Sequence, residues 1–87
     1  MEQFKEKIIM GISVGHREKE ALEVQKLLTE YGCYVKTRLG LHEASNNACS
    51  SKGLIILEFI PNSDDKVQEL EDKLAAIPDV KTGIMEF

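Results

Sequence analysis

The chain has 87 residues, a length that suits one domain and excludes a deep cleft between two. So short a chain buries only about 60 to 65% of the surface that its unfolded form exposes, so we expect a thin core that association with further copies would help to complete. Its 43% apolar and 30% charged residues are typical of a soluble globular protein. The net charge of −4 would repel a phosphate backbone, which argues against direct nucleic-acid binding.

The two cysteines, Cys33 and Cys49, are too few for a disulfide framework. No basic segment followed by an apolar stretch opens the chain, and the longest apolar run is far too short to span a bilayer. We therefore expect a cytoplasmic protein, with no membrane partner and with reduced thiols.

The first half of the chain has the pattern strand, helix, strand. Residues 7–14 are strand-like, and residues 17–31 place apolar side chains at spacings of three and four, which is one face of a helix. Gly32 is expected to end this helix in the left-handed conformation. Residues 34–41 alternate as in a half-buried strand. One side of that strand would carry Val35, Thr37, Leu39 and Leu41.

The second half repeats this order. Residues 54–60 form a strand with almost no polar residue, and a helix follows that Asn62 or Ser63 can cap. Pro78 is expected to end that helix, and residues 80–87 form the last strand. The apolar face of the second helix consists of Val67, Leu70, Leu74 and Ile77.

The two halves match each other residue by residue. The apolar helix positions recur at an offset of 46 residues, and Val35-Lys36-Thr37 recurs as Val80-Lys81-Thr82 at an offset of 45. A repeated βαβ unit predicts an α+β, ferredoxin-like βαββαβ sandwich, with a four-stranded antiparallel sheet and two helices on one face. The whole of residues 1–87 would be this one domain. Strands 1 and 3 would be central, and the charged strands 2 and 4 would be the edges.

Strand 3 is apolar on both sides, although two helices can cover only one side of the sheet. An uncovered face this apolar usually meets another protein surface, so we expect a homo-oligomer, dimer or tetramer, formed through the sheet. The two sides are Ile55, Leu57 and Phe59, and Leu54, Ile56 and Ile60. Which side of strand 1 faces the helices stays open. Its more apolar set is Ile8, Met10, Ile12 and Val14, but the offset of 46 pairs this set with the side that Glu58 interrupts.

Residues that could bind a metal are few. His16, His42, Cys33 and Cys49 do not have the spacing of a structural zinc site. We expect Cys33 to pack after the first helix and the histidines to be solvated. A metal bound by His42, Glu43 and Cys49 is an alternative, and it would need a further ligand from another subunit or from His16.

Two connections could hold a ligand. Residues 42–53 form a long link, which is functional or a mobile hairpin tip, and its serines and asparagines could bind a small polar molecule. The turn from strand 1 into the first helix, residues 13–17, has an anion-binding geometry, although such turns are commonplace. The acidic helix surfaces are expected to be solvated, and no nucleophile, base and orienting group can be assembled. Acylphosphatase, copper-chaperone and RNA-recognition patterns are absent from the sequence.

Several short segments resemble one bacterial family. They are His16-Arg17-Glu18-Lys19, residues 38–43, residues 53–57 and Val80-Lys81-Thr82, and they are similar to the iron-only hydrogenase system regulators. That family has an ACT-like fold related to the C-terminal domain of the nickel-responsive repressor. The resemblance covers nearly the whole chain from Lys7, and it implies a cytoplasmic, oligomeric regulatory or sensor domain without a DNA-binding segment. The long link at residues 42–53 departs from the family, and the repressor's metal-ligand spacing is not matched.

We therefore expect a non-catalytic regulatory or small-ligand-sensing domain, a transcriptional or hydrogenase-system regulator that works as a homo-oligomer without a cofactor. ACT domains typically bind effectors between subunits, near the first strand–helix turn and an edge strand. The resemblance therefore implies ligand binding at Gly15, His16, Arg38 and Gly40. The alternatives are the metal sensor described above and a small hydrolase or isomerase with its site at an oligomer interface.

Overall fold

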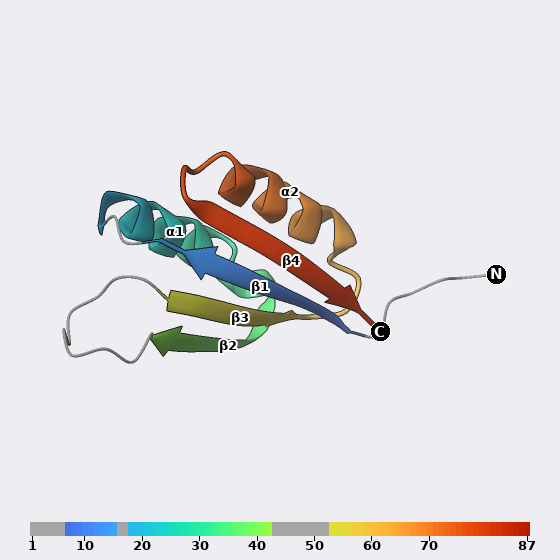
Figure 1. The fold of residues 1–87 in the computed structure, drawn as a ribbon. Coiled ribbons are helices and arrows are strands. Elements are labelled where there is room, and N and C mark those ends of the chain that lie inside the picture. Colours follow the sequence, from blue (N-terminus) through green and yellow to red (C-terminus); the bar gives the residue numbers. More distant parts are fainter. Residues whose placement is uncertain (1–6, 16–17, 43–52) are drawn as a thin grey trace.

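The computed structural model describes residues 7–15, 18–42 and 53–87, with residues 41 and 42 described by their backbone alone. Both helices lie on the same side of one sheet (Figure 1). The strand order is β2-β3-β1-β4, and all neighbouring strands are antiparallel. The elements are β1 (Ile8–Val14), α1 (Glu18–Glu30), the 3-10 helix η1 (Gly32–Tyr34), β2 (Val35–His42), β3 (Gly53–Phe59), α2 (Asp64–Ala75) and β4 (Val80–Glu86). The predicted ferredoxin-like α+β fold, with strands 1 and 3 central, is confirmed.

The core lies between the sheet and the two helices. Met10 and Ile12 of β1, Leu57 of β3, and Leu70 and Leu74 of α2 have no exposed surface. Burying each such side chain contributes about 1.5 to 3 kcal/mol relative to leaving it exposed. The helix-facing set of β1 is Ile8, Met10, Ile12 and Val14, and that of β3 is Ile55, Leu57 and Phe59. The more apolar set of strand 1 therefore faces the helices.

The lengths of the connections explain why the repeat suggested the opposite pairing. Residues 15–17 link β1 to α1, whereas residues 60–63, one residue more, link β3 to α2. Core positions in the strands therefore repeat at an offset of 45, as from Met10 to Ile55, while those in the helices repeat at 46, as from Val24 to Leu70. A single offset cannot align both kinds of element.

The first helix ends differently from the prediction. It ends at Glu30, and no described glycine has a positive φ, so Gly32 does not act as a left-handed cap. Instead Gly32 begins η1, in which the Tyr34 N–H donates to the Tyr31 carbonyl oxygen at 3.0 Å. The prediction that the acidic side chains of the helices are all solvated is wrong at Glu20, which is only 6% exposed.

The second helix begins without a side-chain cap. Ser63 occupies the capping position, but its hydroxyl donates backwards to the Ile60 carbonyl oxygen. Asn62 has a φ of 63°, the left-handed conformation that asparagine tolerates better than most residues. The helix ends at Ala75, before Pro78, and a short turn leads into β4. Ser63 is therefore the N-cap residue, as one of the two predictions had it, but its side chain makes no capping hydrogen bond.

A β-bulge in β2 shifts the alternation of its side chains between the two sides of the sheet. Val35 pairs with Phe59, but Thr37 pairs with Glu58, so Lys36 is an extra residue. Val35 consequently shares the helix-facing side with Phe59, whereas Thr37 and Leu39 lie on the opposite side. The predicted grouping of Val35 with Thr37 and Leu39 is wrong because the periodicity of two breaks at the bulge.

We call the side of the sheet opposite the helices the open face. Its apolar members include Leu39, Leu54 and Met85, which are 51%, 40% and 55% exposed, and the half-buried Ile9 and Ile56. Phe87 follows Met85 by strand alternation, and its N–H donates to the Lys7 carbonyl oxygen at 2.9 Å. The remaining members are Gly11, Ser13, Thr37, Glu58, Lys81 and Gly83.

Candidate functional site

The turn after β1 is held against the start of β4. The Gly15 N–H donates to the Asp79 carbonyl oxygen at 3.1 Å. The Asp79 carboxylate lies where a Cβ on residue 15 would be, so glycine alone fits without a shift of Asp79. This carboxylate opposes anion binding at the turn by charge repulsion. His16 and Arg17, which follow Gly15 in this turn, lie outside the described residues.

Arg38 and Gly40 lie on the edge strand β2. Arg38 is exposed on the helix-facing side, and its guanidinium donates to the Gln25 side-chain oxygen on α1. Gly40 pairs with Ile55, and nothing lies within 4 Å of the position that a Cβ would take. Both residues are open to a partner molecule at this edge.

The three predicted ligand residues that the structure describes, Gly15, Arg38 and Gly40, lie in two places on the sheet. Gly15 follows β1 and Gly40 lies in β2, and because β3 lies between these strands they are about 10 Å apart at the usual strand spacing. The structure brings Gly15 together with Asp79, and Arg38 together with Gln25. Within one chain these two pairs therefore lie on different parts of the sheet.

The alternative metal ligands are largely outside the described part of the chain. Only the backbone of His42 is described, at the end of β2 where it pairs with Gly53, and Glu43 and Cys49 are not described. Among the described residues, no group of three or more histidine, cysteine, aspartate or glutamate side chains could hold a metal ion. Cys33 is exposed, so the expectation that it packs after the first helix is wrong.

A small pocket of about 240 Å³ lies between α1 and β2. Leu28 and Leu57 give it an apolar floor, and Arg38 and the stem of Lys36 border it. The Lys36 ammonium lies 3.9 Å from a Glu58 carboxylate oxygen, and Arg38 is the other cation among the lining residues. The size of this pocket is below the range of about 300 to 1,000 Å³ that is usual for ligand pockets.

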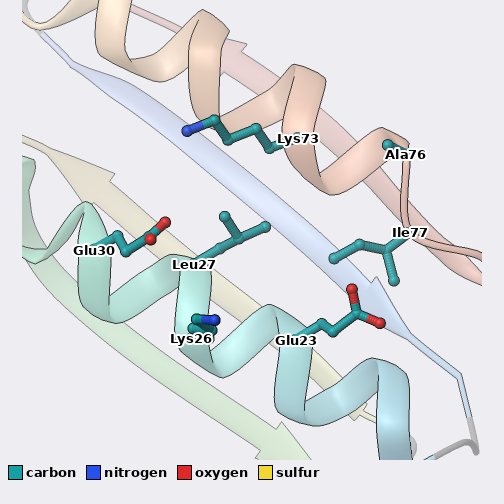
Figure 2. Close-up of a pocket in the computed structure, with 7 residues that line it drawn as sticks. All are labelled: Glu23, Lys26, Leu27, Glu30, Lys73, Ala76 and Ile77. Carbon is teal, nitrogen blue, oxygen red and sulfur yellow. The ribbon is translucent and has the colours of Figure 1, made fainter.

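A larger groove of about 420 Å³ lies between the helices. Leu27 of α1 and Ile77, just after α2, point into the space between the helices (Figure 2). The rest of the lining has two acids and two bases with one alanine: Glu23, Glu30, Lys26, Lys73 and Ala76. These charges offer no surplus of one sign to a ligand, and the groove has the character of a solvated helix–helix junction.

A tyrosine ties the end of α1 to α2. The Tyr31 hydroxyl donates to Glu69 Oε1 at 3.1 Å, and Lys73 Nζ lies 5.1 Å from the centre of the Tyr31 ring. Hydrogen bonding and charge attraction from Tyr31 raise the pKa of Lys73 above 10.5. The Glu69 carboxylate, 3.4 Å away, raises the pKa of Lys66 in the same direction. Both lysines are therefore charged at neutral pH, and this group of residues is a structural tie.

Sequence reasoning missed Asp79, which contacts Gly15, and Gln25, whose side chain contacts Arg38. Asp79 follows Pro78 in a turn, where aspartate is common, so nothing in the pattern marked it. Its φ of 63° and its approach to Gly15 depend on how β1 and β4 pair. Gln25 lies on the exposed side of α1, and only the packing of that helix over β2 gives it a role.

Within the described ranges, no helix is both long and apolar enough to cross a membrane. No protein-family model matches the chain, and no curated protein matches it significantly.

Solved structures match the fold over nearly the whole chain. The uncharacterized protein TM1266 from Thermotoga maritima is 24% identical, with a TM-score of 0.80 over 95% of this chain and 98% of that one. The regulatory subunit of aspartate kinase from Thermus flavus is 16% identical, with a TM-score of 0.54 over 92% of this chain, which spans 51% of that one. The chain has a ferredoxin-like fold of the ACT-like kind.

Proposed function

We propose that the chain is a non-catalytic regulatory domain that senses a small ligand and works as a homo-oligomer, dimer or tetramer, through its open face. The observation that carries this proposal is the open face itself. Leu39, Leu54 and Met85 are each at least 40% exposed there, side by side with Ile9 and Ile56. An apolar surface of this kind on a chain with so thin a core favours a protein partner.

The ligand site lies between two copies. Gly15 and His16 of one copy, together with Arg38 and Gly40 of another, would contact the effector. β3 separates β1 from β2 within one chain, and Arg38 lies on the helix-facing side of β2, so a second copy would have to reach this edge of the sheet to complete the site. Asp79 beside Gly15 and the guanidinium of Arg38 would meet opposite ends of the effector, so a small polar molecule with both a cationic and an anionic group fits best.

A regulatory role agrees with what the described residues offer. The two spaces beside the helices hold no set of nucleophile, base and orienting group. The fold is shared with the regulatory subunit of aspartate kinase. The sequence resemblance to the iron-only hydrogenase system regulators supports a cytoplasmic bacterial regulator of transcription or of a hydrogenase system. The net charge of −4 favours action through another protein rather than through DNA.

A thermal-shift screen of the full chain with amino acids, nucleotides and metal ions tests this function. A specific ligand at 100 times its Kd should stabilise the folded chain by about 2.7 kcal/mol and raise Tm. Arg38→Ala should abolish the shift. Lys26→Ala, which removes an exposed cation from the helix layer, should leave it unchanged.

Two results would contradict the proposal. A substrate screen that detects turnover, with no ligand that raises Tm, would favour the enzyme alternative. A shift produced only by a metal ion, and lost in His42→Ala and Cys49→Ala, would favour the metal sensor.

A further inference from the structure

The two edges of the sheet differ in how far the helices cover them. On β4, the edge strand beside α2, the helix-facing Thr82 and Ile84 are half-buried, and the Thr82 hydroxyl donates to Glu71 Oε2 at 3.2 Å (Figure 1). On β2, the opposite edge strand, every residue from Lys36 to Gly40 is exposed. Within the described part of the chain, the helices therefore cover the β4 edge and leave the β2 edge uncovered.

The β2 edge has the regularity that a further strand needs. After the bulge at Lys36, six consecutive residues pair with β3 in one antiparallel register, from Thr37 with Glu58 to His42 with Gly53. This run contains no proline and no second bulge, two features by which natural sheets disable an exposed edge. Because the outward backbone groups of an edge strand have no partner within the sheet, they can form the ladder hydrogen bonds of an added strand.

The charge of β2 favours one kind of added strand. Lys36 and Arg38 give this strand two cations and it contains no acid, although the whole chain has a net charge of −4. The Arg38 guanidinium donates to the Gln25 side-chain oxygen, a neutral acceptor, so this contact leaves its charge available to a carboxylate. A second copy of β2 would add two more cations and no carboxylate to the edge, whereas an acidic strand would pair with the cations across it.

The small pocket between α1 and β2 lies beside this edge. Leu28 and Leu57 form its apolar floor, and Lys36 and Arg38 are among its lining residues. Its volume of about 240 Å³ is small for a whole ligand and suits one large apolar side chain. A strand added along β2 would direct every second side chain to the helix-facing side, where this pocket and Arg38 lie.

We propose that the outer edge of β2 binds an extended, acidic segment of another protein as an additional strand of the sheet. One apolar side chain of that segment fills the pocket between α1 and β2, and a carboxylate on the same side of the segment pairs with Arg38. Main-chain hydrogen bonds along residues 37–42 supply affinity, while the pocket and the guanidinium select the sequence. This edge is separate from the open face, so the segment can bind the chain whether or not copies associate there.

Binding at this edge would also give the proposed regulator a contact with its target, and in this respect alone it rests on the proposed function. Arg38 is assigned to the effector as well, so the effector and the acidic segment would compete for one guanidinium. Effector binding would then release the target segment from β2.

Fluorescence anisotropy with a labelled peptide tests the inference on the full chain, without added effector. The probe is Glu-Val-Leu-Val-Glu-Val-Glu, blocked at both ends, which as a strand has its leucine and glutamates on one side and its valines on the other. Arg38→Glu should weaken binding by about 10-fold or more, because a charged hydrogen bond is replaced by repulsion. The same peptide with lysine in place of each glutamate should prefer Arg38→Glu to the unmodified chain. The matched control is Lys26→Glu, which reverses an exposed cation at the groove between the helices and should leave binding unchanged.

Methylation of the peptide backbone separates strand addition from simple charge attraction. Successive amides of a strand point to opposite edges, so only every second amide of the probe would face β2. N-methylation of one alternate set of amides should therefore abolish binding, and N-methylation of the other set should preserve it. Replacing the leucine of the probe with alanine should weaken binding, because the pocket is then left unfilled.

Four results would overturn the inference. Absence of binding to the unmodified chain, or equal binding of the acidic and basic peptides, would reject an acidic segment as the occupant. Equal effects of the two methylated sets would reject strand addition, and an alanine probe that binds as well as the leucine probe would reject the pocket. If Arg38→Glu fails to fold by circular dichroism, Arg38→Gln replaces it. A peptide that binds while no ligand raises Tm would keep this inference and contradict only the proposed sensing function.

Discussion

The Gly15 N–H donates to the Asp79 carbonyl oxygen, and the carboxylate of the same aspartate fills the space beside the Gly15 Cα. This contact joins the turn after β1 to the start of β4, at the corner where we place one half of the ligand site. Asp79 makes this approach with a φ of 63°, a conformation that L-residues other than asparagine and aspartate seldom adopt. The corner is therefore built in advance of any ligand.

Gly15→Ala should destabilise the chain by about 1 to 2 kcal/mol, because the new methyl group displaces the Asp79 carboxylate. In an Asp79→Gly background the same substitution should cost less than about 0.5 kcal/mol, since the carboxylate is gone. Urea denaturation of the four proteins of this double-mutant cycle measures the coupling. Equal costs of Gly15→Ala in both backgrounds would show that the two residues do not interfere.

Tyr31→Phe should lower the free energy of unfolding by about 0.5 to 1.5 kcal/mol, the usual net value of one hydrogen bond. The ring stays in the core and only the hydroxyl bonded to Glu69 is lost. Tyr34→Phe is the matched control, because its ring lies beside Tyr31 at a centroid distance of 6.4 Å without a comparable tie from its hydroxyl to α2 among the described residues. If Tyr34→Phe lowers the free energy of unfolding as much as Tyr31→Phe does, the assigned role of the Tyr31–Glu69 hydrogen bond is contradicted.

The alkaline pH dependence should come partly from Lys66 and Lys73. Their folded-state pKa values lie above 10.5, so their stabilising contribution is complete below the unfolded-state pKa of about 10.4 and is lost as the pH rises through the folded-state values. Titration of the lysine Cε resonances by NMR measures both. In Tyr31→Phe the pKa of Lys73 should fall back toward 10.5, whereas that of Lys66 should stay raised by Glu69. A fall of both together would contradict these separate causes.

The repeating apolar pattern was enough to predict the fold. Val67, Leu70 and Leu74 lie in the core where their helical spacing placed them, and β1 and β3 are central as their apolar character indicated. These features depend on short-range periodicity, which a sequence records directly. The ligand residues Gly15, His16, Arg38 and Gly40 remain predictions.

Other features depend on contacts between distant segments. The bulge at Lys36 exists only through the pairing of β2 with β3, and no local pattern in β2 marks it. It decides that Leu39 belongs to the open face and Val35 to the core side. The Asp79 contact with Gly15 likewise joins residues far apart in the chain, and so does the pairing of Gly11 with Gly83. Such features follow from register, which periodicity alone does not specify.

Truncation of two leucines of β3 should affect different properties: folding stability at Leu57 and self-association at Leu54. Leu57→Ala should cost about 2 to 5 kcal/mol of folding stability because it opens a cavity in the core, where Leu57 has no exposed surface. Leu54→Ala removes a side chain that is 40% exposed on the open face, so it should cost less stability and weaken self-association. Urea denaturation and sedimentation velocity on both variants separate the effects. A Leu54→Ala variant with unchanged association would count against the open face as the interface.

Sedimentation equilibrium of the unmodified chain tests the central claim, a sensor domain whose ligand site lies between copies, most directly. At micromolar concentration the account predicts the mass of a dimer or a tetramer, with dissociation only on dilution. A monomer mass throughout the micromolar range would contradict both the interface on the open face and any ligand site shared between copies.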